Sequence, residues 1–572
     1  MRKRSSFLVG RAFRAYLAAT VLTVAATQVA SLVDAALVGS LISAEALGAV
    51  NISKPILQLT FSVGNLFIIG ASVLAGMAIG SGDRGQANRI FTRCFQSVGI
   101  SGLLILLLGL TCFDGILGML CSSDTLRPMA GGYMRIMFVT MVPFLLSYML
   151  ETFVIVDGSP KLATLAVVIS NVANIILDVL FIAVLGWGVE GAASATLIMY
   201  VISTLILLLH FRKGRKDVKV LALDMGSEPG IMKKVVMMGL PVTITTFLIA
   251  VQIAGCNLIS TRFLGDAGVI TFAVCIALLG FSMIFVAGTM RTIQPVGAIL
   301  KGMGDARGIL LMMGRAFRFI TVCLVIYTLI ILIFPEAISS LFGVKDEAML
   351  PIAAKALPVF TLNIILEGIY SLFIPAYQFY DHNKLAMFVA LSKAIFPMFG
   401  FWGMAALSPG NSWWGFFIGQ AAVGLVLLYF TMRERNRNKQ LSPVLLVPLE
   451  PETEVLDLSV PARVDAINDV TNPLVDFVKS KGGSEHTANY AALCCEELLK
   501  NIADHGKAHF VDVKAMMHDG VANISIHDDG VAFNPIDTKE KDQLGLAIVR
   551  GIGSNMRYEY IFNQNMVNVE VK

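Results

Sequence analysis

The sequence predicts a multi-pass α-helical membrane protein that ends in a separate α+β domain. Of the 572 residues, 56% are hydrophobic and 15% are charged, whereas charged residues make up about a quarter of a soluble domain. Twelve apolar runs between about residues 17 and 432 each reach the roughly 20 residues that a helix needs to cross a bilayer. After about residue 433 charged residues are frequent, and no run is long enough to span.

The membrane part contains an internal repeat. GSGDRG at 80–85 returns as GMGDARG at 302–308, and SPKLA at 159–163 returns as HNKLA at 382–386, displaced by 222 or 223 residues. Six spans in each copy make the copies parallel, related by an axis along the membrane normal. We therefore expect two six-helix bundles, residues 1–216 and 217–435, whose rocking about a shared cleft gives alternating access.

Lysines and arginines are distributed unevenly between the predicted turns. They gather before the first span and after even-numbered spans, which by the positive-inside rule places both termini and the tail in the cytoplasm, with the spans in the plasma membrane. The basic residues on this side include Arg2, Lys3, Arg4, Arg84, Arg89, Lys161, Arg212, Lys301, Arg307, Lys384 and Arg433.

Ionisable residues inside the predicted spans are the strongest functional signal. A charge at mid-bilayer costs roughly 2.5 to 3.5 kcal/mol, so one that remains marks a functional position. Asp34 lies within the first span, and Asp178 lies in the fifth, four residues after Asn174 and seven after Asn171. This spacing places the two amides and the carboxylate on one helix face, where they would suit binding of H⁺ or Na⁺.

A structural interpretation of these residues remains open. The same side chains could form a hydrogen-bonded cluster that joins the first and fifth spans. In the second copy the position of Asp34 falls near Asn257, which is neutral, and Glu367 is the one clear acid within a span. We therefore expect ion coupling mainly in the first half, and include Glu367 as a further candidate.

The tail reads as a linker, residues 436–454, followed by a domain at 455–572. Alternating residues predict a strand at TEVLDLSV, amphipathic helices at 462–479 and 484–505, and two hairpins with a short helix, LGLAIVRGI, between them. Helices on one face of a mixed sheet make an α+β sandwich.

Polar residues form a stripe on the second predicted tail helix. Glu497, Asn501 and His505 recur every four residues. An amide oxygen can ligate Mg²⁺, and a carboxylate one turn earlier can act as a base, although a solvated helix face would look the same. Downstream, HDDGVAFNP places Asp528 at a strand end, and Gly545 opens a helix whose N-terminus could receive phosphate.

The membrane part resembles the multidrug and toxic compound extrusion (MATE) family over about residues 10 to 435. The resemblance lies in VDAALVG, SKPILQL, AGMAIGSGDRGQANRIF, SPKLATLAVVISNVANIILDVLFIAVLG, MGLPVTITTF and TIQPVGAILKGMGDARG. It implies a cation-coupled (H⁺ or Na⁺) antiporter that exports small organic compounds across the bilayer. It also implies that Asp34, Asn174 and Asp178 hold the first-half ion site.

The tail resembles the ATP-binding GHKL fold shared by histidine kinases, DNA gyrase, heat-shock chaperones and mismatch-repair ATPases, and most closely anti-sigma-factor serine kinases. The boxes ExxxN, DxGxxF and LGLAIV carry this resemblance. It implies ATP and Mg²⁺ as cofactors, with Asn501 as Mg²⁺ ligand and Glu497 as the catalytic base-like residue. Asp528 and Gly530 would contact adenine, and Gly545 and Leu546 would lie at the phosphate lid.

Two functions follow from these resemblances. The first is an exporter regulated by a nucleotide-binding tail, which would be a serine kinase or weak ATPase acting with a small anti-anti-sigma-like protein. The second is a sensor whose transporter-like part controls the kinase-like tail. Direct ATP-driven pumping is disfavoured because the tail lacks a GxxxxGK[ST] motif, and we expect no nucleic-acid partner.

Overall fold

A computed structural model describes residues 7–121, 126–212, 230–342, 349–449, 455–536 and 544–572. The chain divides into two compact units. Unit 1 contains residues 1–15, 306–312 and 448–572, and unit 2 contains residues 16–305 and 313–447. The expected boundary between the bundles at residue 216 and the linker end at 450–454 lie outside the described residues.

Twelve described helical stretches are long and apolar enough to cross a membrane, which confirms the predicted number of spans. Their exposed sides are apolar, as contact with lipid tails requires; α4 exposes Leu103, Leu104 and Leu107, for example. The elements of the first bundle are α1 (Phe7–Leu41), α2 (Ala44–Ile52), α3 (Lys54–Gly80), α4 (Arg84–Thr111), α5 (Phe113–Leu120), α6 (Arg127–Val156), α7 (Pro160–Asp178), a π-helix (Val179–Val184) and α8 (Gly188–Arg212).

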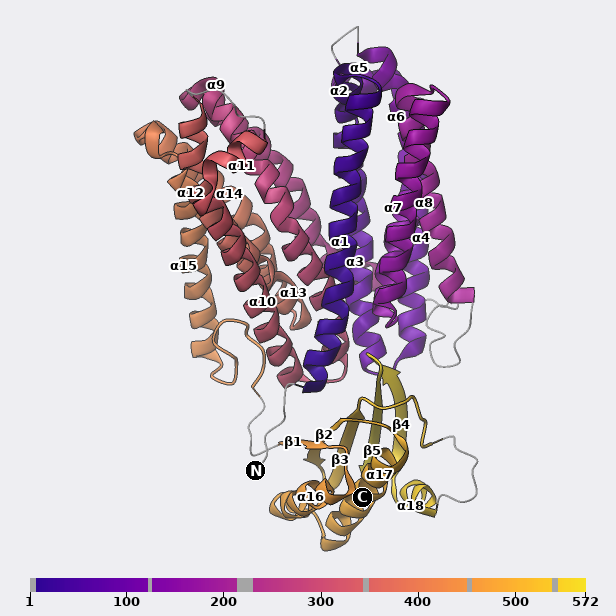
Figure 1. Cartoon of the computed structure of the whole chain (residues 1–572). Coiled ribbons are helices and arrows are strands. Elements are labelled where there is room, and N and C mark those ends of the chain that lie inside the picture. The colour runs from indigo at the N-terminus through magenta and orange to yellow at the C-terminus, as the bar shows by residue number, and fades with distance from the viewer. Residues whose placement is uncertain (1–6, 122–125, 213–229, 343–348, 450–454, 537–543) are drawn as a thin grey trace. The chain divides into compact units, whose positions relative to one another are not determined.

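The remaining six spans form the second bundle (Figure 1). Its first helix, α9, contains two spans separated at Gly265, whose φ of 64° breaks the helical path. The elements are α9 (Ile231–Gly302), α10 (Ala306–Ile333), α11 (Pro335–Leu341), α12 (Leu350–Ser371), α13 (Phe373–Phe379), α14 (Asn383–Leu407) and α15 (Trp414–Arg437).

The two bundles touch backbone to backbone at one end of unit 2. We call this the basic end, because Arg84 and Lys301 lie beside the contact between Gly80 of α3 and Gly302 of α9. A Cβ on Gly80 would lie 2.1 Å from the Ile299 carbonyl oxygen, and one on Gly302 would lie 2.0 Å from the Met77 carbonyl oxygen. Only glycine permits this approach.

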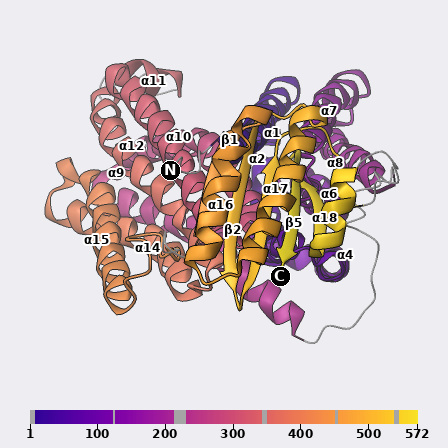
Figure 2. The same ribbon diagram turned by 90° about the horizontal axis from the view of Figure 1, so that it is seen from below.

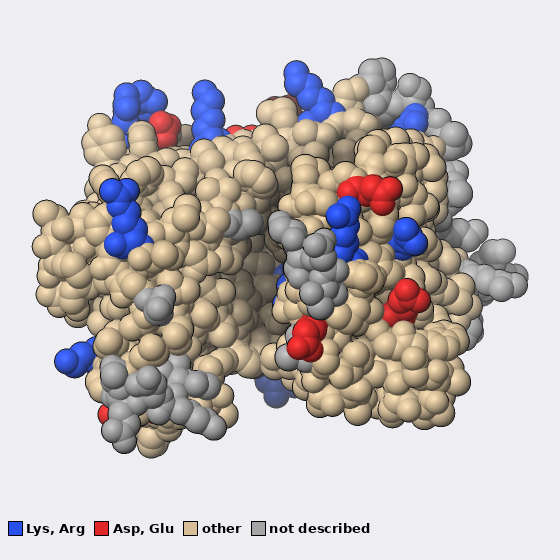
Figure 3. Space-filling model, turned by 90° about the horizontal axis from the view of Figure 1, so that it is seen from above, with Lys and Arg blue, Asp and Glu red and all other residues tan. Residues whose placement is uncertain are grey.

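The opposite end of unit 2 carries α2, α5 and α11 (Figure 1). Seen from that end, the surface is hollowed between the two halves, and a few side chains of both charges surround the hollow (Figure 3). Unit 2 is therefore closed at the basic end and open at the other, as expected for one state of an alternating-access cycle.

We expect Gly80→Ala to weaken closure of the basic end. Its new methyl group would overlap the backbone of α9, and overpacking of this kind costs about 1–3 kcal/mol. The control is Gly99→Ala on α4, where a Cβ would meet nothing within 4 Å. The distance between spin labels at positions 161 and 384, in the first turns of α7 and α14, should lengthen only in Gly80→Ala. Equal distances in both variants would contradict this account of closure.

The C-terminal domain contains a five-stranded sheet of order β1-β2-β3-β5-β4. Its elements are β1 (Val455–Pro461), α16 (Asn468–Ser480), α17 (Glu485–His505), β2 (Phe510–His518), β3 (Val521–Asp528), α18 (Leu544–Ile552), β4 (Ser554–Ile561) and β5 (Gln564–Val571). The three helices lie side by side on one face of the sheet (Figure 2). A single core of buried side chains from helices and strands holds the layers together.

Two sequence-based expectations for this domain were wrong. All four described strand pairings are antiparallel, so the sheet is not mixed. The reason is that two helices rather than one connect β1 to β2: the chain reverses from β1 to α16, from α16 to α17 and from α17 to β2, and three reversals make β2 antiparallel to β1. The first tail helix begins at Asn468 rather than at 462, because a 3₁₀ turn at Val464–Ala466 first leads the chain out of β1.

Candidate functional site

The first polar site lies inside the first bundle, between α1 and α7. Asp178 is the last residue of α7 and is fully buried, while Asp34 is half-buried on α1. The two carboxyl groups interact electrostatically, and the Tyr133 and Tyr200 side chains lie in electrostatic range of Asp34. Lys54, an exposed residue at the start of α3, is also in electrostatic range of Asp34. The sequence placed the two acids in different spans, and the fold brings them together.

The asparagines of α7 lie along the same face. Asn171 and Asn174 are 9% and 4% exposed. Among the described residues, the side-chain nitrogens of both amides, both carboxylate oxygens of Asp178 and Oδ1 of Asp34 have no hydrogen-bond partner. An unsatisfied buried polar group costs about 1–3 kcal/mol. Two carboxylates have no proton of their own to share, so a hydrogen bond between them needs a proton that one of them has taken up.

A π-helix at Val179–Val184 follows Asp178 directly. Segments of this kind are rare and occur preferentially at functional sites. Sequence analysis missed it, because a run of apolar residues such as VLFIAV looks the same in an α-helix and a π-helix. The π-helix changes the helical pitch immediately beside the buried carboxylate, where rotation of a few residues would reposition Asp178.

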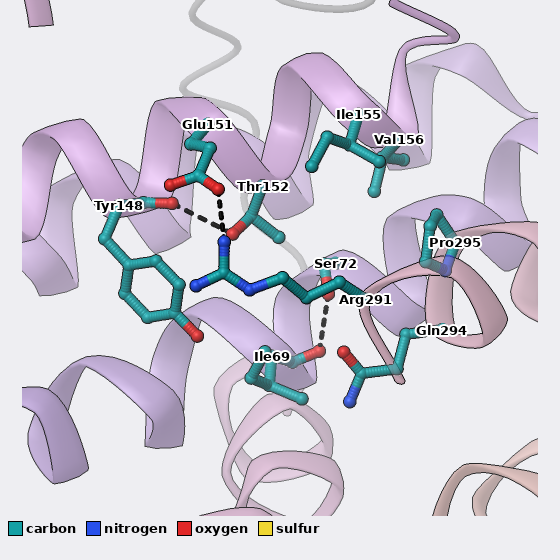
Figure 4. Close-up of a pocket in the computed structure, with 10 residues that line it drawn as sticks. All are labelled: Ile69, Ser72, Tyr148, Glu151, Thr152, Ile155, Val156, Arg291, Gln294 and Pro295. Carbon is teal, nitrogen blue, oxygen red and sulfur yellow. Dashed lines mark hydrogen bonds and ion pairs between the residues drawn. The ribbon is translucent and has the colours of Figure 1, made fainter. Parts of the chain in front are cut away.

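A small pocket lies between the bundles, lined by α3, α6 and the second span of α9 (Figure 4). Its volume is about 20 Å³, enough for a water molecule. Glu151 of α6 pairs with Arg291 of α9, and the guanidinium lies 5.8 Å from the centre of the Tyr148 ring. Sequence analysis missed both charged residues. The signal was available, since each lies within a predicted span.

Hydrogen bonds extend this contact between the bundles. The Tyr148 hydroxyl donates to Asn65 Oδ1 at 2.8 Å, and Asn65 Nδ2 donates to Thr246 Oγ1 at 3.2 Å. Asn65 is on α3 of the first bundle, and Thr246 is on α9 of the second. This network and the ion pair must break when the bundles separate at this level.

Glu367 lies in the second bundle, on α12, apart from the residues of the first-bundle site. It is buried and interacts electrostatically with Lys393 of α14, which is also buried. Lys393 Nζ donates a hydrogen bond to Ser371 Oγ at 2.9 Å. Lys393 is another charged residue within a span that the sequence analysis did not consider.

In the C-terminal domain the structure brings Glu497 and Gly545 together. A Cβ on Gly545 would lie 1.9 Å from Glu497 Oε2, so the carboxylate of α17 rests against the first turn of α18. Asn501 lies one turn further along α17 and is half-buried, and His505 is exposed. Leu546 points away from this edge, because its side chain belongs to the domain core.

Asp528 lies at the end of β3 and is 2% exposed. Its Oδ1 accepts hydrogen bonds from Gly530 N at 2.8 Å and from Asn565 Nδ2 at 2.9 Å. Burial raises the pKa of the Asp528 carboxyl, and these two hydrogen bonds oppose that shift. Gly530 lies against the end of α17, since a Cβ on it would be 2.1 Å from the Gly506 carbonyl oxygen.

Asn565 is a further residue that the sequence did not indicate. It faces Asp528 across the β3–β5 pairing, and its Nδ2 also donates to the Val531 carbonyl. Its Oδ1 accepts from Phe533 N and from the Tyr558 hydroxyl. Asn565 thereby fixes the Asp528 carboxylate and the loop that follows it. No periodic pattern marks a single amide near a hairpin turn.

The neighbouring Asp529 has a different role. It accepts hydrogen bonds from the backbone N–H groups of His509 and Phe510 at 2.7 and 3.1 Å. Although burial opposes the change, these bonds hold the pKa of Asp529 below its ordinary value. Asp529 therefore ties the loop to the start of β2.

The donor set of this edge suits a magnesium nucleotide. Asn501 offers an amide oxygen, Glu497 a carboxylate and Asp528 a buried acceptor. The described residues contain no group of three or more His, Cys, Asp or Glu side chains that could hold a metal ion by themselves. A metal ion here would therefore need oxygen ligands from phosphates and water in addition to the protein.

These features define a membrane protein of two six-helix bundles with a buried acidic site in the first. Residues 19–180 match the family model MatE. The multidrug export protein MepA of Staphylococcus aureus (strain bovine RF122 / ET3-1) is 22% identical over 415 residues, covering 70% of this chain and 88% of MepA. MepA of Staphylococcus haemolyticus (strain JCSC1435) is 22% identical over 410 residues, with the same coverage.

Solved structures give the same result for the fold. A crystal structure of MATE in complex with MaL6 superimposes with a TM-score of 0.69 at 18% identity, over 77% of this chain and 98% of that one. An outward-facing multidrug resistance MATE family transporter gives 0.68 at 19% identity, over the same shares of the two chains. The membrane part therefore shares its fold with these MATE structures, and residues 19–180 match the MatE family model.

Proposed function

We propose that this protein is a cation-coupled antiporter that exports small organic compounds across the plasma membrane. The observation that carries the proposal is the pair of Asp34 and the buried Asp178, with Asn171 and Asn174 beside it; five polar atoms of this cluster have no hydrogen-bond partner within the part of the chain that the structure describes. Two neighbouring carboxylates repel each other unless H⁺ or Na⁺ binds, and Lys54, the basic residue in electrostatic range of Asp34, is exposed rather than buried with them. The MepA relatives, named multidrug export proteins, support the substrate class.

The geometry suggests how ion binding and closure are connected. Binding of a cation between α1 and α7 removes the repulsion between Asp34 and Asp178, and the π-helix after Asp178 allows α7 to adjust its pitch. At the same time the bundles are held together by glycine contacts and by the Glu151–Arg291 pair. A change in packing around α1 and α7 would then alter how the first bundle fits against the second.

For the C-terminal domain we propose Mg²⁺–ATP binding along the α17–α18 edge. Asp528 would accept from the adenine amine, Asn501 would ligate Mg²⁺, and the α18 N-terminus at Gly545 would receive phosphate. ATP bound there would supply a transferable phosphoryl group, and Glu497 would orient an attacking hydroxyl. The resemblance to anti-sigma serine kinases suggests a small cytoplasmic regulatory protein as the partner. With the termini cytoplasmic, this domain would regulate export.

The transport proposal is tested by reconstituting the full chain in sealed liposomes. An imposed pH or Na⁺ gradient should drive accumulation of ethidium, an organic cation, and the accumulation should collapse when an ionophore dissipates the gradient. Accumulation that follows the membrane potential equally in protein-free liposomes, or that requires ATP, would contradict an ion-coupled antiporter.

A further inference from the structure

The ion pair between the bundles has the composition of a binding site for an organic cation. Arg291 extends from α9 toward the carboxylate of Glu151 and the ring of Tyr148, which both belong to α6 (Figure 4). A guanidinium group is a planar cation with delocalised charge and weak hydration, and a carboxylate together with an aromatic face binds it well. The same two groups recognise other organic cations of this kind. Arg291 thus fills a site whose chemistry suits an organic cation.

The groups of this site are divided unequally between the bundles. Glu151 and Tyr148 lie three residues apart on α6, so they share one face of that helix. The Tyr148 hydroxyl donates to Asn65 Oδ1 on α3, another helix of the first bundle, which fixes the ring. The cation comes from the second bundle. When the bundles separate at this level, the carboxylate and the ring stay together, and Arg291 leaves with α9.

The site is closed in the state that the structure describes. The Glu151 side chain is 10% exposed, because Arg291 covers it. Toward the basic end, α3 and α9 touch next at Gly76, where an added Cβ would lie 2.8 Å from the Ala298 Cβ, and then at Gly80. Among the described residues that line the pocket, Glu151 and Arg291 carry the only charges. An organic cation can therefore reach Glu151 from the basic end only after these contacts open and Arg291 withdraws.

We propose that Glu151 and Tyr148 bind the organic cation while the basic end is open, and that Arg291 replaces it there as the bundles close. Arg291 acts as an internal competitor: its guanidinium returns to the carboxylate and the ring, and the displaced cation departs through the opposite end. The positive-inside rule predicts that the basic end faces the cytoplasm, so the substrate would meet this site on entry. The inference rests on the proposed export of organic compounds and adds the class of substrate, a cation with delocalised charge.

The test is equilibrium binding of ethidium, an organic cation with delocalised charge, to the purified full-length chain. Glu151→Gln removes the carboxylate, so we expect the dissociation constant to rise at least about tenfold, as the loss of a charged hydrogen-bond partner requires. Arg291→Met removes the competitor and leaves the carboxylate to the ligand, so we expect the dissociation constant to fall at least about threefold. The double variant should bind like Glu151→Gln, because Arg291 competes only for the intact site.

The opposite signs of these two changes separate recognition from a purely structural contact. If the pair only holds the bundles together, Glu151→Gln and Arg291→Met break it in the same way. Affinities that move in the same direction in the two variants, or that do not move in folded protein, would overturn the proposal. As controls, Glu336→Gln on α11 and Arg262→Met on α9 make the same changes at exposed positions and should bind ethidium like wild type.

A second pair of variants decides the question if the charge changes prevent folding. Tyr148→Phe keeps the aromatic face and Tyr148→Leu removes it, and neither alters a charge. We expect Tyr148→Leu to bind ethidium at least about threefold more weakly than Tyr148→Phe. Equal affinities in these two variants would refute the site. Because binding is measured without an ion gradient, a wild type that binds ethidium as expected but shows no coupled transport contradicts the antiport proposal alone.

Discussion

Asp178→Asn should abolish gradient-driven transport while leaving the protein folded, and Asp34→Asn should do the same. Asparagine matches aspartate in shape and can still hydrogen-bond, but it cannot take up a proton or balance a metal cation. We expect the initial rate to fall to the level of protein-free liposomes, at least about tenfold below wild type, a change of about 1.4 kcal/mol or more. The measurement is ethidium accumulation under an imposed ion gradient.

A matched control separates this effect from a general loss of charge. Asp114 lies on α5 of the same bundle and is exposed, so Asp114→Asn should transport like wild type. The alternative role, a hydrogen-bonded cluster that joins the first and fifth spans, predicts a different pattern. In that case both asparagine variants would keep transport, and only the alanine variants would lose stability.

The second large effect is expected in the C-terminal domain. Asp528→Asn should weaken ATP binding to the full-length protein at least about tenfold, because it replaces a carboxylate acceptor with an amide at a buried position. The measurement is titration of the purified chain with a fluorescent ATP analogue in the presence of Mg²⁺. Since burial raises the pKa of Asp528, the wild-type affinity should also fall on acidification before an ordinary aspartate would titrate.

The control for this change is Asp519→Asn in the β2–β3 turn. Asp519 is exposed and has a φ of 47°, a conformation that asparagine also accepts, so its replacement should leave ATP binding unchanged. Equal ATP affinity in Asp528→Asn and Asp519→Asn would refute the proposed adenine site.

On α17, Glu497→Gln should reduce phosphoryl transfer or hydrolysis without abolishing ATP binding. Glu496→Gln, which changes an exposed neighbour, should leave both the reaction and ATP binding unchanged.

The sequence predicted the arrangement of the membrane part well because the constraint is strong. A backbone in lipid must satisfy its hydrogen bonds within helices. Each long apolar run therefore predicts one membrane-spanning helix. The residues Asp34 and Asp178 could be selected because charge is costly there. Their proximity could not be derived, because it depends on how α1 packs against α7, and spacing along one helix says nothing about its neighbour.

The charged residues that the sequence analysis missed share one reason. Glu151, Arg291 and Lys393 each lie in a span, but their partners lie on other helices: Glu151 and Arg291 pair with each other, and Lys393 donates to Ser371. The π-helix after Asp178 and the role of Asn565 were beyond sequence reasoning, since the first follows from tertiary packing and the second from the register between β3 and β5.

The most direct test of the central claim measures ion release on substrate binding. Ethidium added to purified protein in weakly buffered, Na⁺-containing solution should displace H⁺ or Na⁺ from the cluster of Asp34 and Asp178, detected as a pH change or with a Na⁺-selective electrode. The account predicts a release in wild type that disappears in Asp178→Asn. Ethidium binding that releases neither ion, with an affinity insensitive to both pH and Na⁺, would contradict it.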